Sequence, residues 1–124
     1  MQVDLIDVGS GNTRSVTNWL ENQNLHVNSV RMPESITANT IVLPGVGAAE
    51  NMMNKLESLN FTNAIRSLVN SEIKLIGICL GFQILFESTE ENGGIKTLSI
   101  LPGKVEKISD KVSSHNGWEN FTLD

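Results

Sequence analysis

The stretch Lys74–Glu87, KLIGICLGFQILFE, contains the only cysteine of the chain and lies where one structural pattern gives way to another. Lys74–Ile78 is a short apolar run that predicts a buried strand, and Leu80–Glu87 predicts a helix. Cys79 stands between them, with a glycine two residues to either side. Glycines at such a junction let the strand and the helix pass closely, so we expect Cys79 on a sharp turn.

The sequence before Lys74 shows the same alternation of strands and helices. Three further apolar runs predict strands, at Val3–Val8, Leu25–Val30 and Thr40–Leu43. Residues at helical spacing predict the apolar sides of three helices: Val16, Trp19 and Leu20; Met52, Met53 and Leu56; Phe61, Ile65, Leu68 and Val69. Strands that alternate with helices pair in parallel through right-handed crossovers. We therefore predict an α/β fold, an open and mostly parallel sheet with helices on both faces.

The helical pattern stops after Glu91. Asn92-Gly93-Gly94 is a turn signal, and shorter strands are predicted around Leu98–Leu101, Gly103–Ile108 and Trp118–Leu123. Because no helix is predicted between these strands, we expect an antiparallel addition to the sheet. The last predicted strand runs to the final residues, so we expect residues 1–124 to be one domain that lacks its C-terminal part.

Composition limits the classes of protein to which the chain can belong. A length of 124 residues suits one domain, and 40% hydrophobic with 19% charged residues is typical of a globular protein. The net charge of -5 argues against a nucleic-acid partner. No apolar run is long enough to span a membrane, and the N-terminus lacks the pattern of a signal peptide. We therefore expect a cytoplasmic protein that does not associate with membranes.

Cys79 has two interpretations. A lone cysteine in an apolar segment is usually a small buried hydrophobic residue. The pattern Gly-x-Cys-x-Gly at a strand-to-helix junction, however, is typical of a nucleophile elbow with cysteine in place of serine. There the unpaired N–H groups and the dipole of the helix favour thiolate over thiol. The backbone N–H of Leu80 would then help to stabilise an oxyanion.

A second glycine-rich loop, Leu43-Pro-Gly-Val-Gly47, follows the predicted strand at 40–43. Taken alone it is a turn that ends a strand. Open α/β sheets bind their ligands at the carboxyl ends of the strands, where this loop and Cys79 are both expected. Gly45 and Gly47 would let backbone amides approach a substrate, so the loop is a candidate for a second oxyanion donor.

The motifs together resemble the class I glutamine amidotransferases. They are Asp7-x-Gly-x-Gly-Asn-x-Arg-Ser15, Leu43-Pro-Gly-Val-Gly47, Gly77-Ile-Cys-Leu-Gly-x-Gln83, Leu85-Phe-Glu-Ser88 and Ser114-His-x-Gly-Trp118. Within this class the order and spacing are most similar to the glutaminase subunits of imidazole glycerol-phosphate synthases, which belong to histidine biosynthesis. The resemblance covers nearly the whole chain.

The resemblance implies a reaction and a set of site residues. Cys79 would attack the side-chain amide of glutamine, release ammonia and leave a glutamyl thioester that water hydrolyses to glutamate. The backbone N–H groups of Val46 and Leu80 would form the oxyanion hole. Four positions that correspond to substrate-binding residues are Gly45, Gly47, Gln83 and Glu91. Neither a cofactor nor a metal is implied.

The resemblance also implies a protein partner. Asn12 and Trp118 correspond to residues that face a synthase or cyclase subunit, a (β/α)₈ barrel that receives the ammonia. From the residues alone, the Gly9-x-Gly11 pair could be part of a dinucleotide-binding motif, but the third glycine of that motif is missing. Trp118 taken alone would be assigned to the core rather than to an interface.

One part of the family pattern has no counterpart in the chain. The family uses a histidine near its C-terminus as the catalytic base and a glutamate two residues later to orient it. Here the only histidines are His26 and His115, and a Cys79–His115 dyad is a minor alternative. Three hypotheses stay open: a glutaminase fragment that is inactive alone, a non-catalytic interaction module, and a glutaminase for an amidino-sugar synthase of surface polysaccharides.

Overall fold

The computed structural model describes residues 1–108, 120, 122 and 123, and its centre is a parallel sheet of four strands. The strands are β1 (Gln2–Ile6), β2 (His26–Val30), β3 (Thr40–Gly45) and β4 (Lys74–Cys79). Their order across the sheet is β2-β1-β3-β4, and all three neighbouring pairs are parallel. The predicted α/β fold is confirmed.

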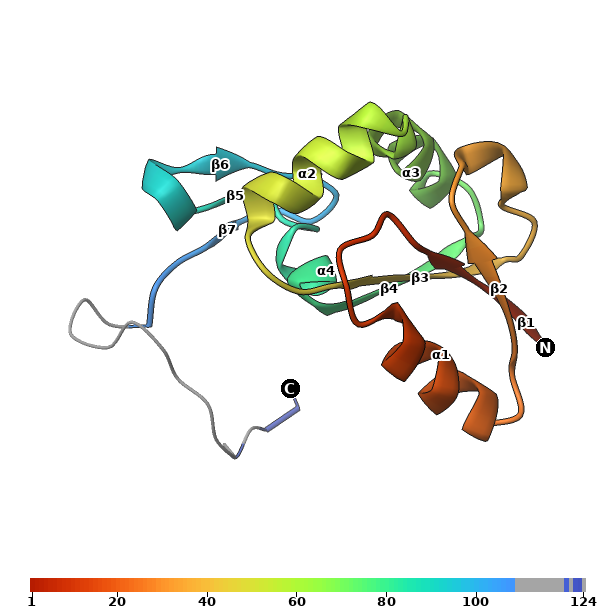
Figure 1. Ribbon diagram of the computed structural model, residues 1–124. Coiled ribbons are helices and arrows are strands. Elements are labelled where there is room, and N and C mark those ends of the chain that lie inside the picture. Colours follow the sequence, from red (N-terminus) through yellow and green to blue (C-terminus); the bar gives the residue numbers. More distant parts are fainter. Residues whose placement is uncertain (109–119, 121, 124) are drawn as a thin grey trace.

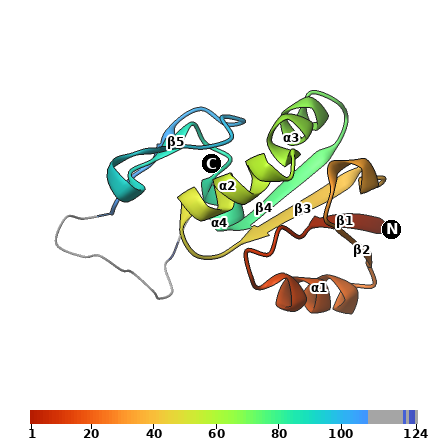
Figure 2. The same cartoon turned by 45° about the horizontal axis from the view of Figure 1, so that its top comes forward.

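Helices cover both faces of this sheet (Figure 1). The helix α1 (Thr13–Asn22) lies on one face, and α2 (Ala49–Ser58) and α3 (Phe61–Val69) lie on the other. A 3-10 turn, η1 (Pro33–Ser35), lies between β2 and β3. Figure 2 shows the resulting three layers, with the sheet between α1 and the α2–α3 pair.

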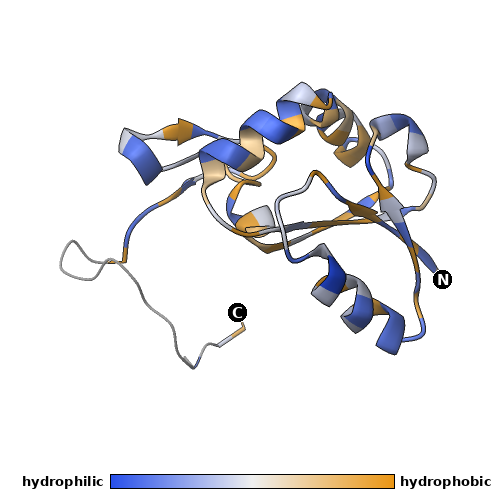
Figure 3. Ribbon diagram, in the orientation of Figure 1, coloured by the Kyte–Doolittle hydropathy of each residue, from blue (hydrophilic) through white to orange (hydrophobic). Residues whose placement is uncertain are grey.

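Two hydrophobic clusters hold the layers together, because successive side chains of a strand point to opposite faces. One cluster contains Val3, Leu5 and Val42 from the sheet with Val16 and Leu20 from α1. The larger cluster joins the other sheet face to α2 and α3, and its sheet and helix members include Ile6, Ile41, Leu43, Met52, Leu56, Phe61 and Ile65. In Figure 3 the strands and α3 are mostly hydrophobic, whereas much of α1 is hydrophilic.

Trp19 departs from the predicted apolar side of α1. Val16 and Leu20 are buried, but Trp19 is 57% exposed. It lies at the rim of the helix, where Trp19, Ser15, Val16 and Ile78 line an apolar groove of about 350 Å³. Since β4 is the edge strand of the sheet beneath α1, the described residues cover only part of the Trp19 side chain.

Asp4 is a buried carboxylate that joins three segments of the chain. It accepts hydrogen bonds from Asn28 Nδ2 (2.8 Å) and from the backbone N–H groups of Thr37 (2.6 Å) and Ala38 (2.7 Å). Burial raises the pKa of the Asp4 carboxyl, but the hydrogen bonds from Ala38, Asn28 and Thr37 outweigh burial and hold the pKa below its ordinary value. The ionised carboxylate therefore ties β1 to β2 and to the segment before β3.

The part after β4 differs from the prediction. It forms a second sheet of β5 (Ser88–Thr89), β6 (Ile95–Lys96) and β7 (Lys104–Val105), with the 3-10 turn η2 (Glu91–Gly93) between β5 and β6. The order is β6-β5-β7, separate from the main sheet, and only the β5–β6 pair is antiparallel. The predicted antiparallel addition to the main sheet is therefore wrong.

The three strands predicted in this part also have other outcomes. Leu98–Leu101 is not a strand, and within Gly103–Ile108 only Lys104–Val105 is one. Leu98–Leu101 forms no strand because its backbone N–H groups donate to the carbonyls of residues 84–86, which are not in a strand. In the third prediction, Trp118–Leu123, residues 118, 119 and 121 lie outside the described residues, and 120, 122 and 123 are not in a strand.

The helix predicted over Leu80–Glu87 is only one turn long, because α4 comprises Leu80–Gln83. The N–H groups of 85–87 do not bond four residues back as in an α-helix. Leu85 N and Phe86 N donate three residues back, to Phe82 O and Gln83 O, and Glu87 N donates to Gly103 O at 2.9 Å. Long-range backbone pairing thus replaces the second helical turn, which no local pattern in 80–87 could reveal.

Candidate active site

Cys79 lies on a sharp turn between β4 and α4, as the sequence predicts. It is the last residue of β4 and the residue before α4, with φ 55° and ψ −119°. A positive φ in a residue with a Cβ is a strained conformation of the kind that collects at functional sites. The Cys79 side chain is exposed to solvent, so the interpretation as a buried hydrophobic residue is wrong.

The glycines on either side of Cys79 are required by close backbone contacts. A Cβ on Gly77 would lie 2.7 Å from both Gly81 O and Phe82 Cα, where no atom fits. A Cβ on Gly81 would collide with the backbone carbonyl of Leu43. The Gly-x-Cys-x-Gly pattern therefore exists because α4 packs its backbone directly against β3 and β4.

The second glycine-rich loop lies beside the cysteine turn. In the parallel register of β3 and β4, Gly45 is the partner of Cys79. A Cβ on Gly45 would overlap the Met52 side chain and would lie 3.2 Å from Gly81 N. The carboxyl ends of two adjacent strands thus bring the predicted loop and the predicted nucleophile together.

Val46 and Gly47 continue this loop into solvent. Val46 is 39% exposed, and Gly47 is exposed with φ +94°. Nothing lies within 4 Å of the position that a Cβ on Gly47 would occupy, so glycine is favoured there by its backbone conformation and not by lack of space. In contrast, Leu80, the first residue of α4 after Cys79, is buried.

Glu91, the first residue of η2, contacts the start of α2, which directly follows this loop. Its Oε2 accepts a hydrogen bond of 2.8 Å from Ala49 N. Asn92 Nδ2 lies 3.3 Å from Glu50 Oε2 in the same first turn of α2. Gln83, the last residue of α4, is half-buried four residues after Cys79. Glu91 is thus close to the loop, and the contact that the structure gives it is with the protein backbone.

The predicted partner-facing turn also adjoins the loop. Asn12, exposed at the start of α1, has φ 62°, and a Cβ on the preceding Gly11 would lie 3.2 Å from Val46 Cγ2. Lys55 Nζ on α2 donates to Gly9 O at 2.8 Å and so attaches this turn to α2. Sequence reasoning missed Lys55, because a lysine on the polar side of a helix carries no local signal of a contact 46 residues away.

The histidines do not supply a base among the described residues. His26 begins β2, which is separated from β4 by the two strands β1 and β3, and it lies at the amino end of its strand, whereas Cys79 lies at the carboxyl end of β4. His115 and Trp118 lie outside the described residues. Within the described part of the chain, no group of three His, Cys, Asp or Glu side chains could hold a metal ion.

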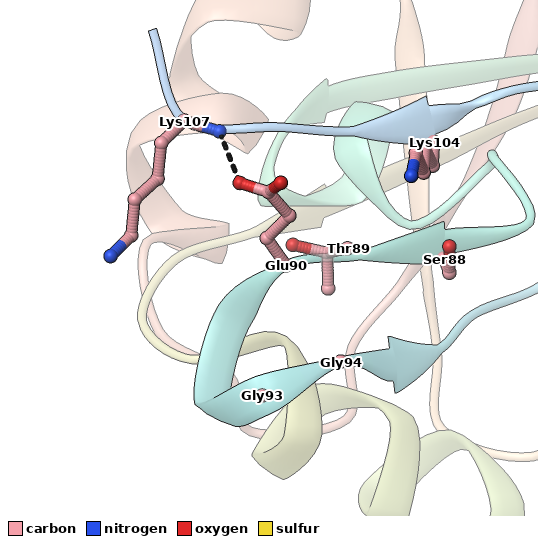
Figure 4. A pocket seen from close by; sticks show the side chains of 7 residues that line it. All are labelled: Ser88, Thr89, Glu90, Gly93, Gly94, Lys104 and Lys107. Carbon is pink, nitrogen blue, oxygen red and sulfur yellow. Dashed lines mark hydrogen bonds between the residues drawn. The ribbon is translucent and has the colours of Figure 1, made fainter. Parts of the chain in front are cut away.

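A cavity of about 450 Å³ lies in the second sheet, apart from Cys79 (Figure 4). Its lining consists of Ser88, Thr89, Glu90, Gly93, Gly94, Lys104 and Lys107. The Glu90 carboxylate accepts a hydrogen bond from Lys107 N at 2.9 Å, and Lys104 pairs with Glu106 at 3.2 Å. The lining thus carries two lysines and one glutamate, and Lys104 already has a carboxylate partner in Glu106 outside the lining.

Comparison with known proteins identifies the family and supports the fold. Residues 4–121 match the family model described as glutamine amidotransferase class-I, and the chain belongs to this family. A crystal structure of a glutamine amidotransferase superposes with a TM-score of 0.76 at 18% identity, and the match covers 90% of this chain and 59% of that one. This structural likeness supports the fold.

The curated relatives of the chain are imidazole glycerol phosphate synthase proteins. An "Imidazole glycerol phosphate synthase subunit HisH" of Dehalococcoides mccartyi is 39% identical over 121 residues, which are 96% of this chain and 59% of the relative. A HisH subunit of Prochlorococcus marinus is also 39% identical, over 94% of this chain and 58% of the relative. The chloroplastic "hisHF" protein of Arabidopsis thaliana is 36% identical over 94% of this chain and 20% of its own length. The chain spans less than two thirds of each relative.

None of the helices in the described part of the chain has the length and apolar character needed to cross a membrane.

Proposed function

We propose that the chain forms the nucleophile-bearing part of a glutaminase that hydrolyses glutamine to glutamate and ammonia. The observation that carries this proposal is the pairing of the strained, exposed Cys79 with Gly45 at the ends of β3 and β4. Val46–Gly47 follows Gly45 and Leu80–Gly81 follows Cys79, so the N–H groups of these two backbone segments are candidates to stabilise an oxyanion. Membership of the class I glutamine amidotransferase family supports the choice of glutamine.

In the proposed reaction the Cys79 thiolate attacks the side-chain amide carbon of glutamine. The carbonyl oxygen becomes an oxyanion that the N–H groups of Val46 and Leu80 stabilise. When the C–N bond breaks, the nitrogen takes up a proton and leaves as ammonia, and a glutamyl thioester forms on Sγ. Water then attacks the thioester, the C–S bond breaks, and glutamate and the free thiolate result.

The proton transfers need a base that the residues near Cys79 lack in the described part of the chain. The relatives are longer than the matched region, and the resemblance assigns a histidine and a glutamate to that further part. We propose that residues 1–124 correspond to the first part of a single glutaminase-type domain and that this pair completes the site. Gly45, Gly47 and Gln83 are proposed to hold the glutamine.

The acceptor of the ammonia is proposed to be a synthase or cyclase subunit of histidine biosynthesis. The names of the relatives, which are imidazole glycerol phosphate synthase subunits, support this choice. Asn12 and Trp118 are the proposed contact residues, and the proposed partner has a (β/α)₈-barrel fold. The contact between Gly11 and Val46 supports an interface close to the oxyanion loop.

The test is ammonia release by the chain alone and after addition of the remaining part of a relative's domain. Purified chain should release no ammonia from glutamine above background. Addition of the C-terminal part of the Dehalococcoides HisH subunit, with its synthase partner present, should restore release. Restored release that survives Cys79→Ala would overturn the proposal. If the chain binds the synthase subunit while every complemented mixture stays inactive, the non-catalytic interaction module is the better account.

A further inference from the structure

The helix α2 begins with a residue that cannot cap it. The position before the helix is Ala48, whose methyl group offers no acceptor to the first N–H groups, although helix N-termini need such acceptors. The Ala49 N–H instead donates to Glu91 Oε2 at 2.8 Å, from a residue 42 positions later in the chain. A carboxylate at this end of a helix is also favoured by the helix dipole.

Glu91 is itself held in place by the second sheet. Its backbone N–H lies 3.3 Å from Thr89 Oγ1, and Thr89 is a buried residue of β5. The neighbouring Asn92 reaches Glu50 on α2 at 3.3 Å, so two consecutive residues of η2 contact the first turn of α2. Both views of the fold show the second sheet beside the start of α2 (Figures 1 and 2).

This contact bears on the oxyanion loop because of where α2 begins. Upstream, the loop is fixed by the pairing of Gly45 with Cys79. Downstream, Ala49 is only two residues after Gly47, and the Glu91 carboxylate fixes it. The exposed residues Val46 and Gly47 therefore lie between two fixed contacts. One is the Gly45–Cys79 pairing in the main sheet, and the other is the Ala49–Glu91 hydrogen bond to the segment of the second sheet.

We propose that Glu91 is a positioning residue that holds the Val46–Gly47 loop in its working conformation by capping α2. This inference rests on the proposed glutaminase function, and it gives Glu91 a role in addition to that of the substrate ligand that the resemblance implies, because the contact with Ala49 uses only Oε2. The two roles make different demands on the side chain. A ligand for the ammonium group of glutamine needs the negative charge, whereas an acceptor for a backbone N–H needs only an oxygen at the same place.

The test compares Glu91→Gln with Glu91→Ala in the complete glutaminase, formed from this chain and the remaining part of the domain with its synthase partner. The amide side chain introduced by Glu91→Gln retains the acceptor oxygen but not the negative charge. We expect Glu91→Ala to lower kcat about tenfold or more, the order lost with one hydrogen bond to a charged group. Glu91→Gln should keep kcat within about threefold of the unchanged protein. Glu90→Ala, which removes the same charge from a carboxylate bonded to Lys107 instead, is the matched control and should change little.

Ala49→Pro removes the donor from the other side of the bond. Proline is well tolerated at the first position of a helix, and the preceding Ala48 already has extended φ and ψ. Ala49→Pro should lower kcat as Glu91→Ala does, and the double variant should be no worse than either single one. A large KM increase shared by Glu91→Gln and Glu91→Ala with kcat unchanged would overturn the positioning role, as would two single effects that multiply.

Hydrogen exchange at the Ala49 amide tests the same inference without activity. In this chain, Glu91→Ala should speed that exchange about tenfold or more, and Glu91→Gln and Glu90→Ala should speed it much less. If the unchanged complex has no glutaminase activity, the proposed function fails while the exchange experiment still decides the role of Glu91. Unchanged exchange in Glu91→Ala, with the thermal unfolding temperature also unchanged, would overturn the capping contact.

Discussion

The main sheet and the second sheet obey different rules, and the site lies where they meet. In the main sheet, each strand from β1 to β4 is a local apolar run, and parallel pairing follows from the intervening helices. In the second sheet the strands are two residues long, and backbone bonds between 84–87 and 97–103 form much of its framework. Cys79 therefore lies in the region that the sequence predicts well, whereas the Glu91 contact next to the Val46–Gly47 loop comes from the region that it predicts poorly.

The largest expected effect tests whether the chemistry resides on the main sheet. In the complemented enzyme, Cys79→Ala should lower kcat for ammonia release by at least about a thousandfold, because it removes the nucleophile. Cys79→Ala should leave the unfolding free energy of the chain nearly unchanged, since the side chain is exposed. Glutamine turnover by the variant at a tenth of the original rate would place the chemistry elsewhere.

The next effect probes the close backbone packing at the cysteine turn. Gly81→Ala should lower the free energy of unfolding by about 3 kcal/mol, because its Cβ would collide with the Leu43 carbonyl of the adjacent strand. Gly47→Ala is the matched control: it meets no atom and should cost about 1–2 kcal/mol through its positive φ alone. Urea unfolding of both variants measures the difference. Equal losses would mean that α4 does not pack against β3.

A smaller effect concerns Asp4, the buried carboxylate in β1 of the main sheet. The pKa of Asp4 is lowered in the folded chain, so its contribution is complete above the ordinary value of 3.8 and is lost as the pH falls below it. Asp4→Asn should lower the free energy of unfolding by about 2 kcal/mol at pH 7. The difference from the unchanged chain should shrink as the pH falls below that value. A difference that is constant from pH 7 to pH 2 would contradict this reading.

The smallest effect distinguishes the second sheet from the first. Thr97 Oγ1 donates to Phe86 O at 2.6 Å, where Ser99 N also donates at 2.8 Å. Thr97→Val should cost about 1 kcal/mol, since Phe86 O keeps one donor. Amide exchange should quicken in residues 84–101 and not in β1 to β3. Equal quickening throughout the chain would show that the two sheets unfold as one unit.

Sequence reasoning recovered the elements whose signals are local. The turn at Cys79 could be predicted because Gly77 and Gly81 stand at fixed offsets from it, and the α/β fold followed from the periodicity of the apolar runs. The single-turn length of α4 could not be predicted, since the Glu87 N–H that a longer helix would use donates instead to Gly103 O, 16 residues later in the chain. The exposure of Trp19 and the contacts of Lys55 with Gly9 and of Glu91 with Ala49 could not be predicted either. Each depends on segments that are distant in the sequence and adjacent in the fold.

The residues to which the resemblance assigns roles occupy different places in the structure. The structure brings Cys79 and Gly45 into register and puts Val46 and Gly47 directly after them. It puts Glu91 next to α2 through a backbone contact that its motif does not encode. The proposed functions of these residues, and of Gln83, Asn12 and Trp118, stay predictions.

The central claim is that Cys79 is a nucleophile directed at glutamine, and one measurement tests it most directly. Mass spectrometry should follow alkylation of Cys79 in this chain by a chloroketone analogue of glutamine and by iodoacetamide, each relative to a free thiol. We predict that the glutamine analogue reacts faster with Cys79 than with the free thiol and that added glutamine protects the cysteine. Equal relative rates for the two reagents, without protection by glutamine, would contradict the account.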